Sequence, residues 1–171
     1  MENLKYKGQF ISVTEEEIDG IYWERAYLHD GVIVYASDND GHFYLILERR
    51  PHEKPAQRLK MVTGIYETEF SLEENVNREL QEEIGKKAKE IELLLSVKSS
   101  GTINTTTHIV WARDVYDSKL PNPDGEDTIM EIQKVSFSNL ERMILNHEIK
   151  WSLSTLGFFK IKQLIEQRKL S

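Results

Sequence analysis

The segment from Ser71 to Gly85 constrains the fold most, because it carries helix signals at its start, along its length and at its end. Ser71 and Glu74 have the spacing of a capping box, in which each side chain accepts a hydrogen bond from the other residue's backbone N–H. One apolar stripe recurs every four positions, at Val76, Leu80 and Ile84. Gly85 suits the left-handed conformation that ends many helices. We therefore predict a helix over residues 72–84.

Short apolar runs rich in β-branched residues dominate the rest of the chain, and turn signals such as Asp19-Gly20 and Asp38–Gly41 separate them. The predicted strands are 7–13, 21–28, 31–37, 42–49, 58–63, 91–99, 105–114 and 129–137, and the predicted later helices are 139–145 and 153–168. Many strands with one central helix and a helical end indicate an α+β fold or an α/β/α sandwich. A length of 171 residues suits one core, so we predict a single domain over 1–171.

The composition excludes several classes of function. A net charge of −7 argues against a protein that binds a nucleic-acid backbone, although bound cations can still attract small anionic substrates. The absence of cysteine excludes disulfides, thiol catalysis and thiolate metal sites. The N-terminus has no apolar signal core and no run reaches membrane-spanning length, so we expect a cytoplasmic protein without a membrane partner.

Three glutamates on the predicted helix are the first candidates for chemistry. At roughly 100° per residue, Glu79, Glu82 and Glu83 fall within an arc of about 100° beside the apolar stripe. Their like charges repel at helical spacing, and a divalent cation would reverse that cost, since Mg²⁺ binds carboxylate oxygens, water and phosphates. The alternative is a solvated acidic face of the helix.

The sequence around this helix matches a longer pattern: a glycine, five residues, a glutamate, seven residues, then R-E-aliphatic-x-E-E-x-G and an aliphatic residue. The stretch resembles the Nudix box. The positions that match in register are Gly64, Arg78, Glu79, Leu80, Glu82, Glu83 and Gly85. The resemblance implies a loop–helix–loop metal platform on a Nudix-like α/β/α sandwich with a mixed sheet.

Two positions depart from this pattern: Phe70 replaces its first glutamate, and Lys86 replaces its closing aliphatic residue. In the family, that glutamate is thought to orient the arginine that matches Arg78. The acids that could replace it are Glu69, Glu73 and Glu74. Glu74 has the best spacing, because it precedes Arg78 by four residues. Phe70 itself could pack beside its neighbours or line the substrate pocket.

Outside the box, the chain is most similar to the ADP-ribose pyrophosphatase branch. Arg50 falls on the arginine of that branch's Q-x-R-P segment, Glu48 replaces the glutamine, and Trp23 and Arg25 fall on its second strand. We predict Arg50, Arg25 and Trp23 as substrate-binding residues, since arginine clamps phosphate and tryptophan stacks on bases. The alternatives are exposed arginines and a tryptophan that packs in a core or dimer interface.

The resemblance also assigns roles at the reaction centre. The predicted metal ligands are Glu79, Glu83 and Glu82, with a backbone carbonyl from the Gly64 region. The predicted catalytic residues are Glu82, Glu126 and Arg78. Glu126 is the preferred general base, with Asp127 or Glu82 as alternatives, because it lies in a proline-flanked loop that could deliver a catalytic group. The cofactor is predicted to be Mg²⁺, with Mn²⁺ as a substitute.

These observations predict a metal-dependent hydrolase that cleaves the diphosphate linkage of a nucleoside diphosphate derivative, with an ADP-ribose-like substrate favoured. A nucleoside-diphosphate-sugar or other dinucleotide hydrolase is one alternative. A nucleotide-sensing domain without turnover is another, which Phe70 keeps open. Residues 1–30 are predicted to form an N-terminal extension of antiparallel strands and to serve as a dimerisation element, as in the branch that the chain resembles, so we expect a homodimer.

Overall fold

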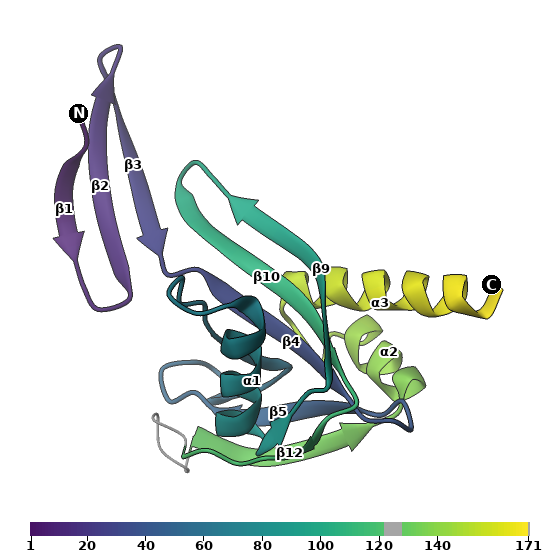
Figure 1. Ribbon diagram of the computed structural model, residues 1–171. Helices are drawn as coiled ribbons and strands as arrows, with labels where there is room; N and C mark the ends of the chain where they lie inside the picture. Colours follow the sequence, from purple (N-terminus) through teal and green to yellow (C-terminus); the bar gives the residue numbers. More distant parts are fainter. Residues whose placement is uncertain (122–127, 171) are drawn as a thin grey trace.

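The computed structural model describes residues 1–121 and 128–170 (Figure 1). The strands are β1 (Asn3–Lys7), β2 (Ile11–Ile18), β3 (Ile21–Leu28), β4 (Gly31–Ser37), β5 (Phe43–Arg49), β6 (Gln57–Lys60), β7 (Val62–Ile65), β8 (Lys86–Lys87), β9 (Glu90–Ser99), β10 (Ile103–Arg113), β11 (Tyr116–Asp117) and β12 (Ile129–Val135). The helices are α1 (Leu72–Glu83), α2 (Phe137–Leu145) and α3 (Ser152–Leu170). The fold is α+β, as the sequence predicts.

Strand β10 organises the mixed sheet. It pairs parallel with β4 and, over a short stretch, with β3, and it pairs antiparallel with β9. The main path through the sheet runs β1-β2-β3-β10-β4-β5-β12, and β6, β7 and β9 pair with β5, β4 and β10. Strands β1 to β3 extend away from the helices as an antiparallel unit (Figure 1), which is the predicted N-terminal strand extension.

Helices cover both faces of the central sheet, and alternate residues of β4 enter separate cores. Val32 and Val34 pack with α1 residues such as Leu80. Ile33 and Tyr35 pack with residues of α2 and α3 on the opposite face. Each such buried side chain contributes roughly 1.5–3 kcal/mol of transfer free energy. The three layers form the α/β/α sandwich that the sequence indicates.

Helix α1 begins and ends where its sequence signals predict. Ser71 Oγ accepts a hydrogen bond from the Glu74 backbone N–H at 3.2 Å, and the Glu74 carboxylate accepts one from the Ser71 N–H at 2.8 Å. The last turn closes at Ile84, and Gly85 follows with φ +65°. Of the apolar stripe, Val76 and Leu80 are completely buried. The box helix is therefore anchored along its apolar face.

Two predicted strands are each divided in the structure. In the stretch 7–13, the Gly8 backbone N–H bonds to Ile11 O at 2.8 Å and turns the chain between β1 and β2. The stretch 58–63 becomes β6 and β7, separated by the buried Met61. This break occurs because β6 pairs with β5 whereas β7 pairs with β4.

The extension β1–β3 differs from the sandwich in what it exposes. Its large apolar residues are between 40% and 64% exposed: Leu4, Tyr6, Phe10, Ile11, Ile18, Ile21, Tyr22, Trp23 and Leu28. Such a collection is unusual for a surface without a partner. No helix in residues 1–121 and 128–170 has the length and apolar character of a membrane span.

Candidate active site

A cavity of about 710 Å³ opens where β4 begins, β5 ends and α1 faces the sheet. Its polar and charged lining residues are His29, Glu48, Arg50, Lys60, Thr63, Glu67, Arg78, Glu79, Glu82, Glu83, Thr105, Thr107 and Thr128. The apolar and backbone part of the lining includes Gly31, Gly64 and Trp151. The structure thus brings five predicted site residues of the box helix and its loop, together with Arg50, to one cavity.

Glu79 approaches the backbone of β7 so closely that only glycine fits there. A Cβ atom added to Gly64 would lie 1.9 Å from Glu79 Cδ. Burial is the main cause that raises the pKa of Glu79 to about 8, and the negative charges of Glu83 and Glu82 add to it. The ionised form of this carboxyl group is therefore unfavourable unless a cation lies beside it.

Glu83 is more deeply placed and is held on both oxygens. Its Oε1 accepts a hydrogen bond from Lys60 Nζ at 3.1 Å, and its Oε2 accepts one from the Thr63 backbone N–H at 3.1 Å. Burial raises the pKa of Glu83, and Lys60 and the Thr63 N–H oppose that rise without cancelling it. These contacts fix the direction in which Glu83 presents its carboxylate.

Lys60 and Glu48 connect this carboxylate to Arg50. Lys60 Nζ lies 3.4 Å from Glu48 Oε1, and Arg50 Nε donates to Glu48 Oε2 at 2.6 Å. Neither residue is predicted from the sequence as part of the site, where Glu48 has no assigned role. Their signal is weak, because a lysine in a short strand is most often exposed. In the structure, both side chains belong to the cavity.

Arg78 has a different partner from the one that the sequence favours. Its Nη2 lies 2.9 Å from Glu67 Oε1 and donates to Asn75 Oδ1 at 3.3 Å. Its guanidinium carbon also lies 5.2 Å from the centroid of the Phe70 ring. The prediction of Glu74 was wrong, because that carboxylate caps the helix at Ser71 instead. Phe70 therefore contacts Arg78 through the face of its ring.

Asn75 explains why the loop before α1 can hold this arrangement. Its buried side chain accepts from the Glu67 N–H and donates to the backbone oxygens of Glu67 and Ser71. An asparagine inside a helix disfavours the helix intrinsically, and here it fastens the loop to the helix. Nothing in the sequence distinguishes this role from that of an exposed asparagine.

The sequence profile of the NUDIX domain matches residues 27–154, which include this entire loop and helix. The chain belongs to the Nudix domain family. Among solved structures, that of an ADP compounds hydrolase superposes with a TM-score of 0.81, covering 98% of this chain and 93% of its own, at 17% sequence identity. At this identity the likeness shows the fold alone. No curated protein sequence matches the chain.

The donor set of the Nudix helix fits a divalent cation. Carboxylates of Glu79, Glu82, Glu83 and the neighbouring Glu48 line the same cavity, and hard oxygen donors of this kind are what Mg²⁺ and Mn²⁺ prefer. The raised pKa of Glu79 indicates that its carboxylate has less positive charge around it than its ionised form requires. A cation at this place would supply that charge.

Two predicted site residues of the Nudix chain lie elsewhere. Trp23 and Arg25 belong to β3 and are not part of the cavity lining. Arg25 contacts Glu2 and Glu16, both at 3.1 Å, and Trp23 is 52% exposed. Glu126 lies outside the residues that the structure describes.

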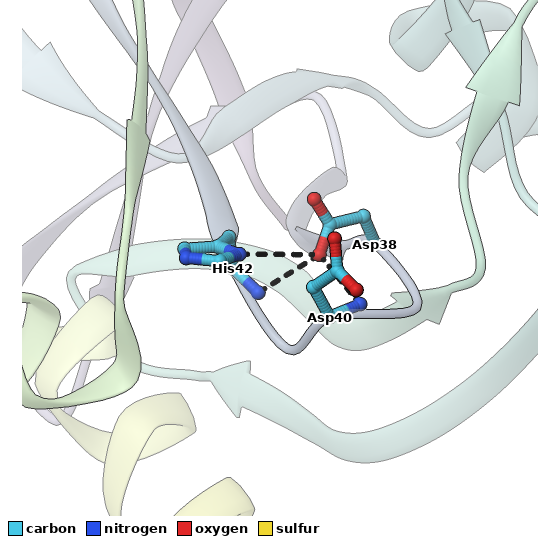
Figure 2. Close-up of side chains that lie close together, drawn as sticks. All are labelled: Asp38, Asp40 and His42. Atoms are coloured by element: carbon cyan, nitrogen blue, oxygen red, sulfur yellow. Dashed lines mark hydrogen bonds and ion pairs between the residues drawn. The ribbon is translucent and has the colours of Figure 1, made fainter.

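A second group of potential ligands lies at the other end of β4, in the hairpin that leads to β5. Donor atoms of Asp38, Asp40 and His42 lie within 4.8 Å of one another (Figure 2). Asp38 Oδ1 accepts hydrogen bonds from the backbone N–H groups of Asp40 and His42, at 3.0 and 2.9 Å. Asp38 Oδ2 lies 2.5 Å from Lys134 Nζ. This carboxylate already has partners in the hairpin backbone and in β12.

Proposed function

We propose that this Nudix chain hydrolyses the diphosphate linkage of a nucleoside diphosphate derivative with the help of divalent cations. The observation that carries the proposal is the convergence of three box glutamates, Arg78 and Arg50 on one cavity. A cavity of about 710 Å³ is within the size of small-molecule sites. The ADP compounds hydrolase with the same fold supports an ADP-containing substrate, and we favour one resembling ADP-ribose.

Each group in the cavity has a role in this proposal. When bound, Mg²⁺ or Mn²⁺ would neutralise phosphate oxygens and lower the pKa of the attacking water. Glu79 and Glu83 would hold the cations with Glu82, and the Gly64 backbone would complete the ligand set. Glu126 is the preferred base that takes the proton from water, and Glu82 is the candidate base in the described cavity.

The two arginines would have different roles: one would bind the substrate, and the other would hold the loop and helix that carry the metal ligands. Arg50, which Glu48 holds in the cavity at 2.6 Å, would bind phosphate oxygens of the substrate. Arg78, which Glu67 and Asn75 hold, would keep the loop and helix in register around Glu79. This division separates substrate affinity from the geometry of the metal ligands.

The test is a panel of ADP-ribose, nucleoside-diphosphate sugars and dinucleoside polyphosphates, each with Mg²⁺, with Mn²⁺ and with chelator. We expect metal-dependent release of a nucleoside monophosphate, fastest from ADP-ribose. Nucleotide binding without product release under both metals would show a sensing domain instead. A faster reaction with another member of the panel would identify a different preferred substrate for the same hydrolysis.

The exposed apolar surface of β1–β3 supports a homodimer, because a surface of this kind is stabilised by burial against a partner. Trp23 and Arg25 lie outside the cavity of their own chain, so they can contact substrate only across such an interface. Light scattering at micromolar concentration should give the mass of a dimer. A monomer there would remove both the dimer and the substrate contacts of Trp23 and Arg25.

A further inference from the structure

Lys60 is the most deeply buried charged side chain at the cavity, with 2% of it exposed. Its ammonium group has three partners: Glu83 Oε1 at 3.1 Å, Thr63 Oγ1 at 2.7 Å and Glu48 Oε1 at 3.4 Å. The lysine thus uses its three donors on oxygen atoms of the site. It occupies a position between two carboxylates, as a bound cation would.

Packing alone does not account for a lysine here. Moving an ammonium group out of water is unfavourable unless close oxygen partners compensate for the lost hydration. The residue after it, Met61, fills a buried position of similar size with an apolar side chain. A charge at position 60 is matched instead to the carboxylates of Glu48 and Glu83, which would otherwise face each other in a buried place.

We propose that Lys60 is an internal monovalent counter-ion that competes with the divalent cation for the carboxylate of Glu83. It would keep Glu83 and Glu48 assembled in the metal-free protein and weaken divalent binding by occupying Glu83 Oε1. The presence of a divalent cation at Glu83 rests on the proposed function. The competition itself rests on the contacts of Lys60.

The same lysine links the metal ligands to the substrate arginine. Glu48 contacts Lys60 through Oε1 and Arg50 through Oε2. A cation that displaces Lys60 from Glu83 leaves the lysine on Glu48, so that Glu48 shares its charge between Lys60 and Arg50. Lys60 is therefore a positioning residue, which acts through Glu83 and Glu48.

The experiment is a titration of the nucleotide-free protein with Mn²⁺, followed by electron paramagnetic resonance. Lys60→Met should bind Mn²⁺ at least about tenfold more tightly than the wild type, whereas damage to the site would weaken binding. Lys60→Arg should restore the wild-type Kd, because it restores the positive charge. Lys54→Met is the matched control: it removes the same charge from an exposed lysine outside this cavity and should leave the Kd unchanged.

Folding is followed in parallel by thermal unfolding with and without Mn²⁺. Lys60→Met should have a lower Tm than the wild type without metal and a larger rise in Tm with Mn²⁺. If it does not fold without metal, Glu48→Gln/Lys60→Met, which removes one charge of each sign, is compared with Glu48→Gln, and the double variant should bind Mn²⁺ more tightly.

An unchanged or weaker Mn²⁺ affinity in folded Lys60→Met would overturn the inference. Wild-type protein that binds Mn²⁺ but hydrolyses no substrate of the panel would contradict the proposed function alone, and the comparison with Lys60→Met would still decide the role of the lysine. If neither protein binds Mn²⁺, both proposals fail.

Discussion

Acidic side chains from other segments lie near both ends of strand β4, and the two groups differ in what neutralises them. At the hairpin end, Asp38 accepts hydrogen bonds from two backbone N–H groups and forms an ion pair with Lys134, while Asp40 is exposed. At the cavity end, the buried ammonium group of Lys60 lies between the carboxylates of Glu48 and Glu83, and Glu79 and Glu82 line the same cavity. The hairpin group brings its donor atoms closer together, yet the Asp38 carboxylate already has two backbone N–H groups and Lys134 as partners.

The pKa of Asp38 at the hairpin end is lowered, whereas the pKa of Glu79 at the cavity end is raised. Burial raises the pKa of Asp38, but Lys134 and the backbone N–H groups of His42 and Asp40 outweigh it and leave the pKa below its usual range. Burial and two neighbouring glutamates raise the pKa of Glu79 to about 8. A cluster that needs additional positive charge is a better candidate for a metal site than one that merely places ligand atoms close together.

The largest difference between the cavity end and the hairpin end of β4 should be in how much hydrolysis is lost when a carboxylate is removed. Glu83→Gln keeps the size and helix propensity but removes the charge, so we expect magnesium-dependent hydrolysis to fall at least about 100-fold, beyond the 10- to 100-fold typical of outer partners of a metal. The helix should remain folded by circular dichroism. Asp40→Asn at the hairpin should retain wild-type kcat. Equal losses in the two variants would erase the distinction between the ends.

The stability of the metal-free protein should respond to pH with opposite signs at the two ends. The raised pKa of Glu79 means that stability falls as pH rises from about 4.5, its ordinary pKa, to about 8. Glu79→Gln should therefore raise the unfolding free energy at pH 8, by on the order of a few kcal/mol. The lowered pKa of Asp38 contributes stability that is present above its ordinary pKa and is lost as pH falls, so Asp38→Asn should destabilise the protein at neutral pH.

Urea unfolding of both variants and the wild type from pH 5 to pH 9, with chelator present, measures these free energies. The difference between Glu79→Gln and the wild type should grow with pH. A difference that stays constant over this range would show that Glu79 ionises normally in the folded protein.

The cations that accompany the two groups should also differ in function. Arg50→Met should raise KM about tenfold with a smaller change in kcat, since a hydrogen bond to a charged group contributes roughly 1.5–3 kcal/mol. Lys134→Met removes the cation that pairs with Asp38 at the other end and should leave KM unchanged. Steady-state kinetics at saturating Mg²⁺ decides between them. An unchanged KM in Arg50→Met would take Arg50 out of the substrate site.

The smallest effect is expected at Phe70. Phe70→Glu should leave kcat/KM unchanged or raise it, with little change in metal affinity, because Glu67 and Asn75 still hold Arg78 and the new carboxylate can replace the ring contact. Glu67→Gln, which removes the ion pair, should reduce kcat/KM more. A fall of more than about tenfold in Phe70→Glu, roughly 1.4 kcal/mol of transition-state stabilisation, would show that the aromatic ring is a working part of the site.

The sequence predicts the local features of this molecule well. The capping box at Ser71, the apolar stripe and the cap at Gly85 fixed the box helix to within one residue, because these signals act over one or two turns. The hairpin at Asp38–Gly41 also formed as predicted. The switch of pairing at Met61 was missed, since it depends on which strands lie beside β6 and β7.

The same limit applies to the site. The box glutamates could be grouped from helical spacing alone, whereas the network of Lys60, Glu48 and Glu83 joins residues that are distant in sequence. The partner of Arg78 was missed for a related reason: Glu74 has the better helical spacing, but its carboxylate is used at the helix start, and Glu67 reaches Arg78 from the preceding loop.

The most direct test of the difference between the two ends is Mn²⁺ added in substoichiometric amounts to ¹⁵N-labelled protein, with the broadening of each amide signal followed by NMR. We predict that the amides of Thr63, Gly64, Glu79 and Glu83 broaden first and that those of the hairpin, 38–42, remain sharp. Broadening confined to the hairpin, with sharp signals at Gly64 and along α1, would contradict the assignment of the metal site to the Nudix helix.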